Sequence, residues 1–288
     1  MTVRRPAAPH FYAGDCARAT DRFLRGFSPP EQPARVVAGV VPHAGWDYSG
    51  AVAAKVFESI RRSDTPATFV FFGATHRWAN GNAVYARGAW ATPLGEVAID
   101  EELSAALLEQ TPGLLNENPL AHDGEHAIEV ELPFVKYLFP DAKVVPISVS
   151  PSEDAVPLGQ RVAKLLTSWP RPAVIIGSTD LTHYGDVYHF TPAGYGRRAR
   201  EWMQANDGRI LRLAEQMHAS EIVAEAQSHQ NACGPGALAA TVAAASVLGA
   251  GRGYLLEHTS SFEVAPHQNE DGDNAEFRMA VGYAGILY

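Results

Sequence analysis

Two histidines and one cysteine occupy positions where α/β proteins often place the residues that do chemistry. His43 follows the apolar run 35–41, and His76 follows a second apolar run, 68–72. Cys233 begins a long uncharged stretch that we expect to be helical. In open α/β sheets the loops after the strands gather at one edge, and ligands bind there. Imidazole and thiolate groups in one crevice predict a metal site or an acid–base site.

Each of these residues also has a structural explanation. A histidine such as His43 can cap the end of a strand, His76 can be an ordinary surface-loop residue, and buried cysteines are common in protein cores. The equivalent placement of the two histidines after their strands favours a shared cation. A helix start lowers the pKa of a thiol, which favours a thiolate at Cys233 that acts as a ligand or a nucleophile.

A further polar loop follows the apolar run 172–176 and contains Asp180, His183 and Tyr184. Its functional interpretation is a general base, His183, oriented by the carboxylate of Asp180. The phenol of Tyr184 would add a hydrogen-bond donor nearby. The alternative is that Asp180 caps a short helix and that the loop has no chemical role.

Two more groups of residues are candidates for a pocket. The segment 122–131 is dense in histidine and glutamate, and we expect His126 and Glu129 to face the pocket from one side of a helix. Trp46 and Tyr48, together with the tyrosine of the polar loop, are expected to line it as substrate-binding aromatic residues. Aromatic residues near strand ends are also ordinary core, so this interpretation has a structural alternative.

The elements that would position these residues alternate between strands and helices. Continuous apolar runs predict buried strands, and longer stretches between them have helical spacing. Such alternation predicts an α/β fold with a mostly parallel central sheet and helices on both faces, which we expect to form one domain over residues 1–288. The main expected strands cover 35–41, 68–72, 143–149 and 172–176, with closing strands at 253–256 and 279–283. The main expected helices cover 51–61, 125–139 with Pro133 as an interior fault, 155–168 and 233–248.

Composition narrows the classes of function. The chain has 288 residues, a formal net charge of -9 and no cluster of lysine or arginine, which argues against nucleic acid as a partner. Two distant cysteines and no signal-peptide pattern favour a cytoplasmic protein. The uncharged stretch 232–251 is rich in alanine and glycine, so we expect a buried helix and no contact with a membrane. The acidic stretch 268–274 is expected to be a turn. No feature of the sequence specifies an oligomeric state.

Ordered motifs along nearly the whole chain resemble those of the Memo family, which includes the bacterial AmmeMemoRadiSam system protein B. The matching motifs are Pro42-His43-Ala44-Gly45-Trp46-x-Tyr48-Ser49-Gly50, Gly73-x-Thr75-His76, Thr92-Pro93-Leu94-Gly95, Glu125-His126-x-Ile128-Glu129-Val130, Ser178-Thr179-Asp180-Leu181-Thr182-His183-Tyr184, Ala232-Cys233-Gly234 and Val281-Gly282-Tyr283.

The resemblance implies a fold similar to that of class III extradiol dioxygenases, non-haem iron enzymes that open catechol-type rings. It implies that His43, His76 and Cys233 are metal ligands and that His183 is the catalytic acid–base, with Asp180 beside it. His126 would be a second histidine of the pocket. A thiolate stands where the dioxygenases use glutamate, which makes the site softer, so copper or zinc compete with Fe(II).

These inferences lead to one main hypothesis and two alternatives. The main one is a metal-dependent oxidoreductase, a non-haem iron dioxygenase that uses O₂ and a small, phenolic substrate. The first alternative is a non-catalytic, Memo-like protein whose pocket binds a peptide or a metal. The second is a hydrolase in which Cys233 is the nucleophile and His183 its base.

Overall fold

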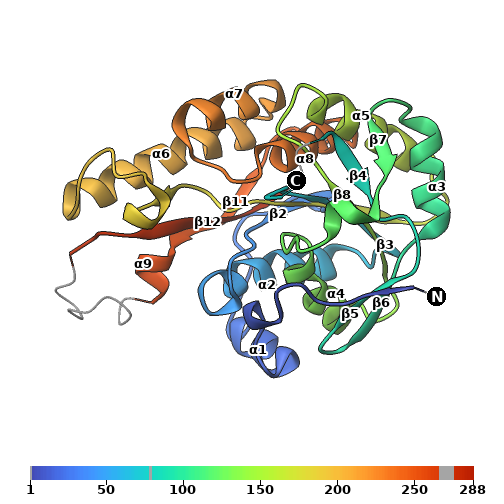
Figure 1. The fold of residues 1–288 in the computed structure, drawn as a ribbon. Helices are drawn as coiled ribbons and strands as arrows, with labels where there is room; N and C mark the ends of the chain where they lie inside the picture. Colours follow the sequence, from blue (N-terminus) through green and yellow to red (C-terminus); the bar gives the residue numbers. More distant parts are fainter. Residues whose placement is uncertain (1, 78–79, 266–275) are drawn as a thin grey trace.

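Four parallel strands form the centre of the fold. The computed structural model describes residues 2–77, 80–265 and 276–288, and the predicted turn at 268–274 lies outside them. The central strands, in spatial order, are β2 (Ala38–Val41), β9 (Ala173–Ser178), β3 (Thr68–Gly73) and β8 (Lys143–Ser148). They are almost entirely buried because helices cover both faces of the sheet (Figure 1). The α/β fold predicted from the sequence is confirmed.

The sheet continues on both sides of this centre in antiparallel pairs. On one side, β12 (Ala280–Leu287) pairs with β2, and both β10 (His183–Tyr184) and β11 (Tyr254–Ser260) pair with β12. On the other side, β4 (Asn82–Val84) is antiparallel to β8 and parallel to β7 (Leu115–Glu117). The parallel arrangement therefore holds for the centre, and the sheet as a whole is mixed. A separate small sheet contains β1 (Val3–Arg4), β5 (Ala89–Thr92) and β6 (Gly95–Ala98).

The helices on one face enclose an aromatic core. These helices are α1 (Cys16–Phe23), α2 (Trp46–Ser63) and α4 (Leu132–Leu138), which lie below the sheet in Figure 1. Phe57 of α2 packs against Phe69 of β3 and Phe134 of α4, with ring centroids 5.9 and 5.7 Å away. All three rings are fully buried. This core fixes the start of α2, and with it the loop that carries His43.

The helices on the other face pack through small residues. They are α3 (Glu101–Gln110), α5 (Ala155–Leu166), α6 (Arg197–Glu215), α7 (Ala219–His229) and α8 (Pro235–Val247). A Cβ atom added to Gly159 of α5 would lie 2.1 Å from the carbonyl oxygen of Ala240 in α8, so the two helix backbones are in direct contact. The uncharged stretch is thus a buried helix, as predicted. Within the described ranges, no helix is both long and apolar enough to cross a bilayer.

The segment 119–138 includes most of the single helix that we expected over 125–139, and it is not one helix. It forms two 3-10 turns, Pro119–His122 and Glu129–Glu131, before α4 begins at Leu132. Pro133 therefore lies in the first turn of a helix, where its missing N–H has no intrahelical partner to lose. The remaining short elements are the 3-10 turns Pro9–Phe11 and Asp186–Tyr188 and the helix α9 (Ser261–Val264).

Candidate metal centre

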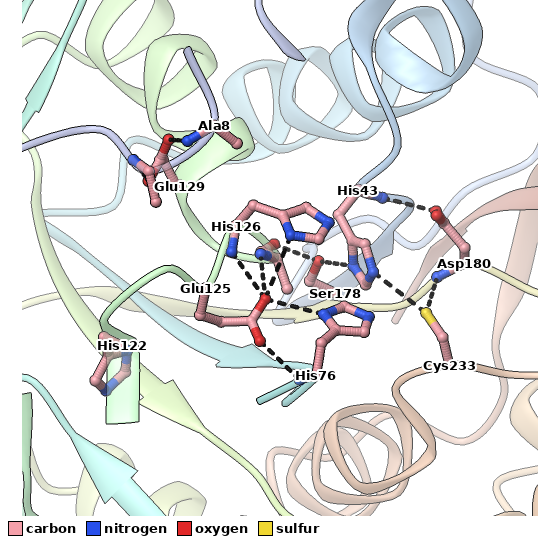
Figure 2. Close-up of polar contacts among 12 residues, drawn as sticks. Ala8, His43, His76, His122, Glu125, His126, Glu129, Ser178, Asp180 and Cys233 are labelled. Carbon is pink, nitrogen blue, oxygen red and sulfur yellow. Dashed lines mark hydrogen bonds and ion pairs between the residues drawn. The ribbon is translucent and has the colours of Figure 1, made fainter. Parts of the chain in front are cut away.

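Three candidate ligands converge at the carboxyl edge of the central strands. His43 follows β2, His76 follows β3, and Cys233 precedes α8. One nitrogen of each imidazole and the sulfur of Cys233 all lie within 4.8 Å of one another. Figure 2 shows the two rings and the thiol gathered around a common space. The structure thus brings together the three residues that the sequence analysis singled out as metal ligands.

The hydrogen bonds of Ser178 orient His43. The Ser178 hydroxyl donates its single hydrogen to the carbonyl oxygen of Ala127 at 2.6 Å. It must therefore accept a hydrogen bond from Nδ1 of His43, which lies 2.8 Å away. His43 is 1% exposed, and this contact places a proton on Nδ1. Nε2 faces the sulfur of Cys233, and it can bind a cation once its hydrogen bond with the sulfur is released.

Glu125 orients His76 in the same way, but with a charged group. Nδ1 of His76 donates to the carboxylate at 3.0 Å, and the backbone N–H groups of His76, His126 and Ala127 also donate to it. Burial raises the pKa of Glu125, but the hydrogen bonds and charge of His76 outweigh burial and hold this pKa well below its usual range. Histidine ligands in metal sites typically donate their second N–H to such a partner. The other nitrogen of His76 can therefore bind a cation once its hydrogen bond with Cys233 is released.

Cys233 is held as a thiolate by its neighbours. The N–H of Asp180 donates to the sulfur at 3.2 Å, and Nε2 of His43 lies 3.2 Å from it. Burial raises the pKa of the thiol, but the charge of His43 and hydrogen bonds with His43 and His76 lower it to about 6. The helix starts only at Pro235, so the expected position of Cys233 in the first turn of the helix was wrong by two residues. Neighbouring side chains, not the helix, provide the main lowering of the pKa.

Asp180 connects the candidate ligands to His183. Its Oδ1 accepts the backbone N–H of His43 at 2.8 Å, and its Oδ2 lies 3.9 Å from Nε2 of His183. Burial raises the pKa of Asp180, but the charge of His43 and the hydrogen bond with His183 lower it below its usual range. Burial lowers the pKa of His183, but Asp180 and the charge of Cys233 raise it overall. The arrangement favours a carboxylate next to a protonated imidazole.

His126 lies in the same pocket, and its pKa is shifted in the opposite direction from that of His183. Its ring stacks on that of His76, with centroids 5.0 Å apart, and meets the ring of His43 edge-on at 5.5 Å. Burial lowers the pKa of His126, and the charges of His43 and His76 lower it further, to about 4. The pKa of His126 is therefore lowered and that of His183 raised within one cavity, and such divergent pairs are typical of acid–base sites.

The cavity has a volume of about 630 Å³ and one polar and one largely apolar side. His43, His76, His126, Asp180 and His183 contribute the polar side. Aromatic and apolar residues line the rest, among them Phe11, Tyr12, Tyr48, Tyr188, Phe262, Met279 and Tyr283. This volume and lining are typical of small-molecule sites.

Two of the three predicted aromatic residues line the cavity. Tyr48 lines it and is half-buried. Trp46 also lines it, although only 3% of the residue is exposed and its ring stacks on Phe134 at 4.0 Å. Tyr184 is fully buried, outside the lining of the cavity, with its hydroxyl donating to the carbonyl of Gly194. Adjacent residues of a strand point to opposite faces, so the exposure of His183 to the cavity turns Tyr184 away from it.

The structure also corrects the expectation for Glu129. Its carboxylate is 1% exposed and faces the N-terminal segment, where it accepts the N–H groups of Ala7 and Ala8. Figure 2 shows it apart from the three histidines of the cavity. Ser178 and Glu125, in contrast, are part of the site although the sequence analysis gave neither a role in holding a ligand. Glu125 could have been found in the sequence from its position next to His126. Ser178 has no such indication apart from its position at the end of a strand.

The donor set suits a soft or borderline cation. Two imidazole nitrogens and a thiolate favour zinc, copper or iron over magnesium or calcium, which prefer oxygen ligands. The groups His76–Glu125–His126 and Asp180–His183–Cys233 also bring their ligand atoms within 4.8 Å. Because Glu125 already accepts four hydrogen bonds, His43, His76 and Cys233 form the set that is best prepared to receive a metal.

Comparison with known proteins gives relatives along nearly the whole chain. Residues 4–286 match the family described as Memo-like protein. The chain is 33% identical to a MEMO1 family protein of Thermococcus onnurineus, over 99% of each chain. It is 35% identical to a MEMO1 family protein of Methanosarcina acetivorans, over 100% of this chain and 99% of the relative.

A solved structure supports the fold independently. An uncharacterized protein from Escherichia coli K12 superimposes with a TM-score of 0.53 and 12% identity, over 86% of this chain and 99% of the other. At this identity the likeness concerns the fold alone. The match of the family across almost the whole chain and the full-length relatives lead to one conclusion: this chain belongs to the Memo-like family.

Proposed function

We propose that this protein is a metal-dependent oxidoreductase that uses Fe(II) and O₂ to oxidise a small phenolic substrate. The observation that carries the proposal is the position of His183 and Asp180. This acid–base pair opens on the same cavity as two imidazoles whose Nδ1 atoms are hydrogen-bonded to Ser178 and Glu125 and whose other nitrogens lie near the thiolate of Cys233. A site that only stored metal would not need a proton-transferring pair next to its ligands.

Each residue has a role in this proposal. His43, His76 and Cys233 would hold the metal, and bound Fe(II) would supply the redox chemistry with O₂. His183 would remove a proton from a substrate hydroxyl and later return one, while Asp180 stabilises its protonated form. The neutral imidazole of His126 would accept a hydrogen bond from the substrate, and the ring of Tyr48 would contact its apolar part.

Metal content tests the ligand assignment. Protein purified anaerobically should contain nearly one iron per chain, measured by elemental mass spectrometry, and His43→Ala and Cys233→Ala should lose it. His183→Ala should keep the metal and lose metal-dependent oxygen uptake with phenolic compounds. His218→Ala is the control, because its side chain is exposed and, among the residues that the structure describes, pairs with Glu221 at the surface. Full metal occupancy in His43→Ala would refute the assignment.

Two other results would point to the alternative functions. Stoichiometric metal without oxygen uptake in any phenolic screen would support a non-catalytic, metal- or peptide-binding protein. The 3.2 Å contact between Cys233 and His43 also resembles an activated nucleophile with its base. A protein that binds no metal after reconstitution but reacts stoichiometrically with iodoacetamide at Cys233 would favour that cysteine chemistry over the oxidoreductase.

A further inference from the structure

One buried carboxylate fastens the N-terminal segment over the cavity. Glu129 accepts the N–H of Ala7 at 2.7 Å and that of Ala8 at 2.9 Å, and the hydroxyl of Tyr12 also donates to it. Arg4 forms an ion pair with it at 2.6 Å, and this guanidinium is almost buried. Four donors from residues 4–12 therefore converge on a side chain that is 1% exposed.

The fastened segment forms part of the cavity wall. Phe11 lines the cavity and packs edge-on against the ring of His126, with centroids 4.8 Å apart. His126 in turn stacks on His76, one of the three candidate ligands. The position of Phe11 thus depends on hydrogen bonds to its neighbours on both sides, at Ala8 and at Tyr12.

Arg4 ties the same segment to the residues that hold His76. Its guanidinium donates to the carbonyl oxygens of His122 and Glu125, at 2.8 and 2.7 Å, and lies over the ring of Trp90. Glu125 orients His76 with its side chain while its carbonyl group holds the N-terminal segment. The short stretch 122–129 therefore both holds the N-terminal segment in the cavity wall and orients the candidate ligand His76.

We propose that Glu129 is a positioning residue that fixes Phe11 in the cavity wall, and that Phe11 determines the preference of the site for ligands with an aromatic ring. The proposal rests on the proposed function only in taking this cavity as the ligand site. It adds to that function a residue far from the candidate ligands that controls which molecules bind beside them.

Hydrogen exchange of the metal-free protein tests the fastening. In Glu129→Gln, the amides of residues 7 and 8 should exchange about 10- to 100-fold faster than in the wild type, because hydrogen bonds to a charged acceptor are lost. Glu131→Gln is the matched control, since Glu131 is equally buried on the same 3-10 turn and its Oε2 has no hydrogen-bond partner within the described part of the chain. Unchanged exchange in Glu129→Gln, or equal acceleration in the control, would overturn the proposal.

Ligand preference tests the role of Phe11. Cobalt(II)-loaded protein is titrated with imidazole and with 4-phenylimidazole, and binding is followed by the visible absorption of the metal. Glu129→Gln and Phe11→Ala should each lose about 3- to 10-fold of the preference for the phenyl-bearing ligand, the size of one aromatic pair. Glu131→Gln should keep it.

The two experiments test separate parts of the proposal, so that either can fail without the other. If Phe11→Ala keeps the full preference, Phe11 is not the determinant and the proposal is wrong. If the wild type does not bind cobalt, the proposed function fails, while the exchange experiment still decides whether Glu129 fastens the segment. Tyr12→Phe removes a single donor and provides a milder variant if Glu129→Gln does not fold.

Discussion

The hydroxyl of Ser178 has one hydrogen, and the direction of that hydrogen decides which nitrogen of His43 faces the candidate metal site. Ser178→Ala should therefore weaken metal binding about 10- to 100-fold, as loss of such outer contacts typically does, without removing any ligand. Competition titration with zinc measures the affinity. Ser59→Ala is a suitable control, because its buried hydroxyl only donates to the carbonyl of Lys55. Equal affinity in wild type and Ser178→Ala would show that the tautomer of His43 is set by something else.

The low pKa of Cys233 gives a direct pH dependence. The rate at which iodoacetamide alkylates the metal-free protein should be low below pH 6 and increase with pH around a midpoint of about 6, because only the thiolate reacts. His43→Ala removes a charge and a hydrogen bond that stabilise the thiolate, so its midpoint should move upward. Cys233→Ala provides the background rate, which should be low since Cys16 is fully buried. A wild-type midpoint at or above 8.5, the pKa of an unperturbed thiol, would contradict the geometry.

Sequence position was a good guide to the candidate ligands, and a poor guide to the residues that hold the ligands and the cavity wall in place. His43, His76 and Cys233 each stand next to the end of a strand or the start of a helix, so local pattern was enough to place them at one edge. Glu129 faces residues more than 115 positions away, and no local pattern records such a contact. Tyr184 was expected in the cavity because the strand β10 was not recognised in the sequence. Successive side chains of a strand point to opposite faces, so recognising β10 would have separated Tyr184 from His183.

At the scale of the elements, the contact between α5 and α8 depends on Gly159 having no Cβ atom. Gly159→Ala should destabilise the protein by about 1–3 kcal/mol, since the added methyl meets the backbone of α8 and forces the helices apart. Gly208→Ala in α6 meets only the flexible end of Arg212 and should be neutral or slightly stabilising. Urea unfolding of both variants measures the difference. A Gly159→Ala protein as stable as the wild type would show that the two helices can separate at no cost.

The same elements show where sequence patterns reach their limit. The central strands were predictable because apolar residues fill them on both faces. The antiparallel strands at the sides were not predictable as such, since the partner of a strand is chosen by tertiary contacts. The segment 125–139 was misread as one helix because its glutamates and histidines have helical spacing. The carboxylates of Glu125 and Glu129 instead accept hydrogen bonds from distant backbone N–H groups, which favours short turns.

For the whole molecule, metal binding should increase stability, because the candidate ligands come from segments that only folding brings together. Zinc at 100 times its dissociation constant should raise the free energy of unfolding by about 2.7 kcal/mol. Cys233→Ala should gain much less at the same concentration. Thermal unfolding with and without zinc makes the comparison, and an equal gain in both proteins would place the bound metal elsewhere.

The order of the strands has a consequence for protein synthesis. One edge of β2 is covered by β9, but its other edge pairs with β12, which ends at residue 287. While the ribosome makes the residues between them, β2 has an unpaired edge that can join other chains. The nascent protein therefore needs protection from aggregation until β12 emerges, and we expect this chain to depend on holding chaperones during translation.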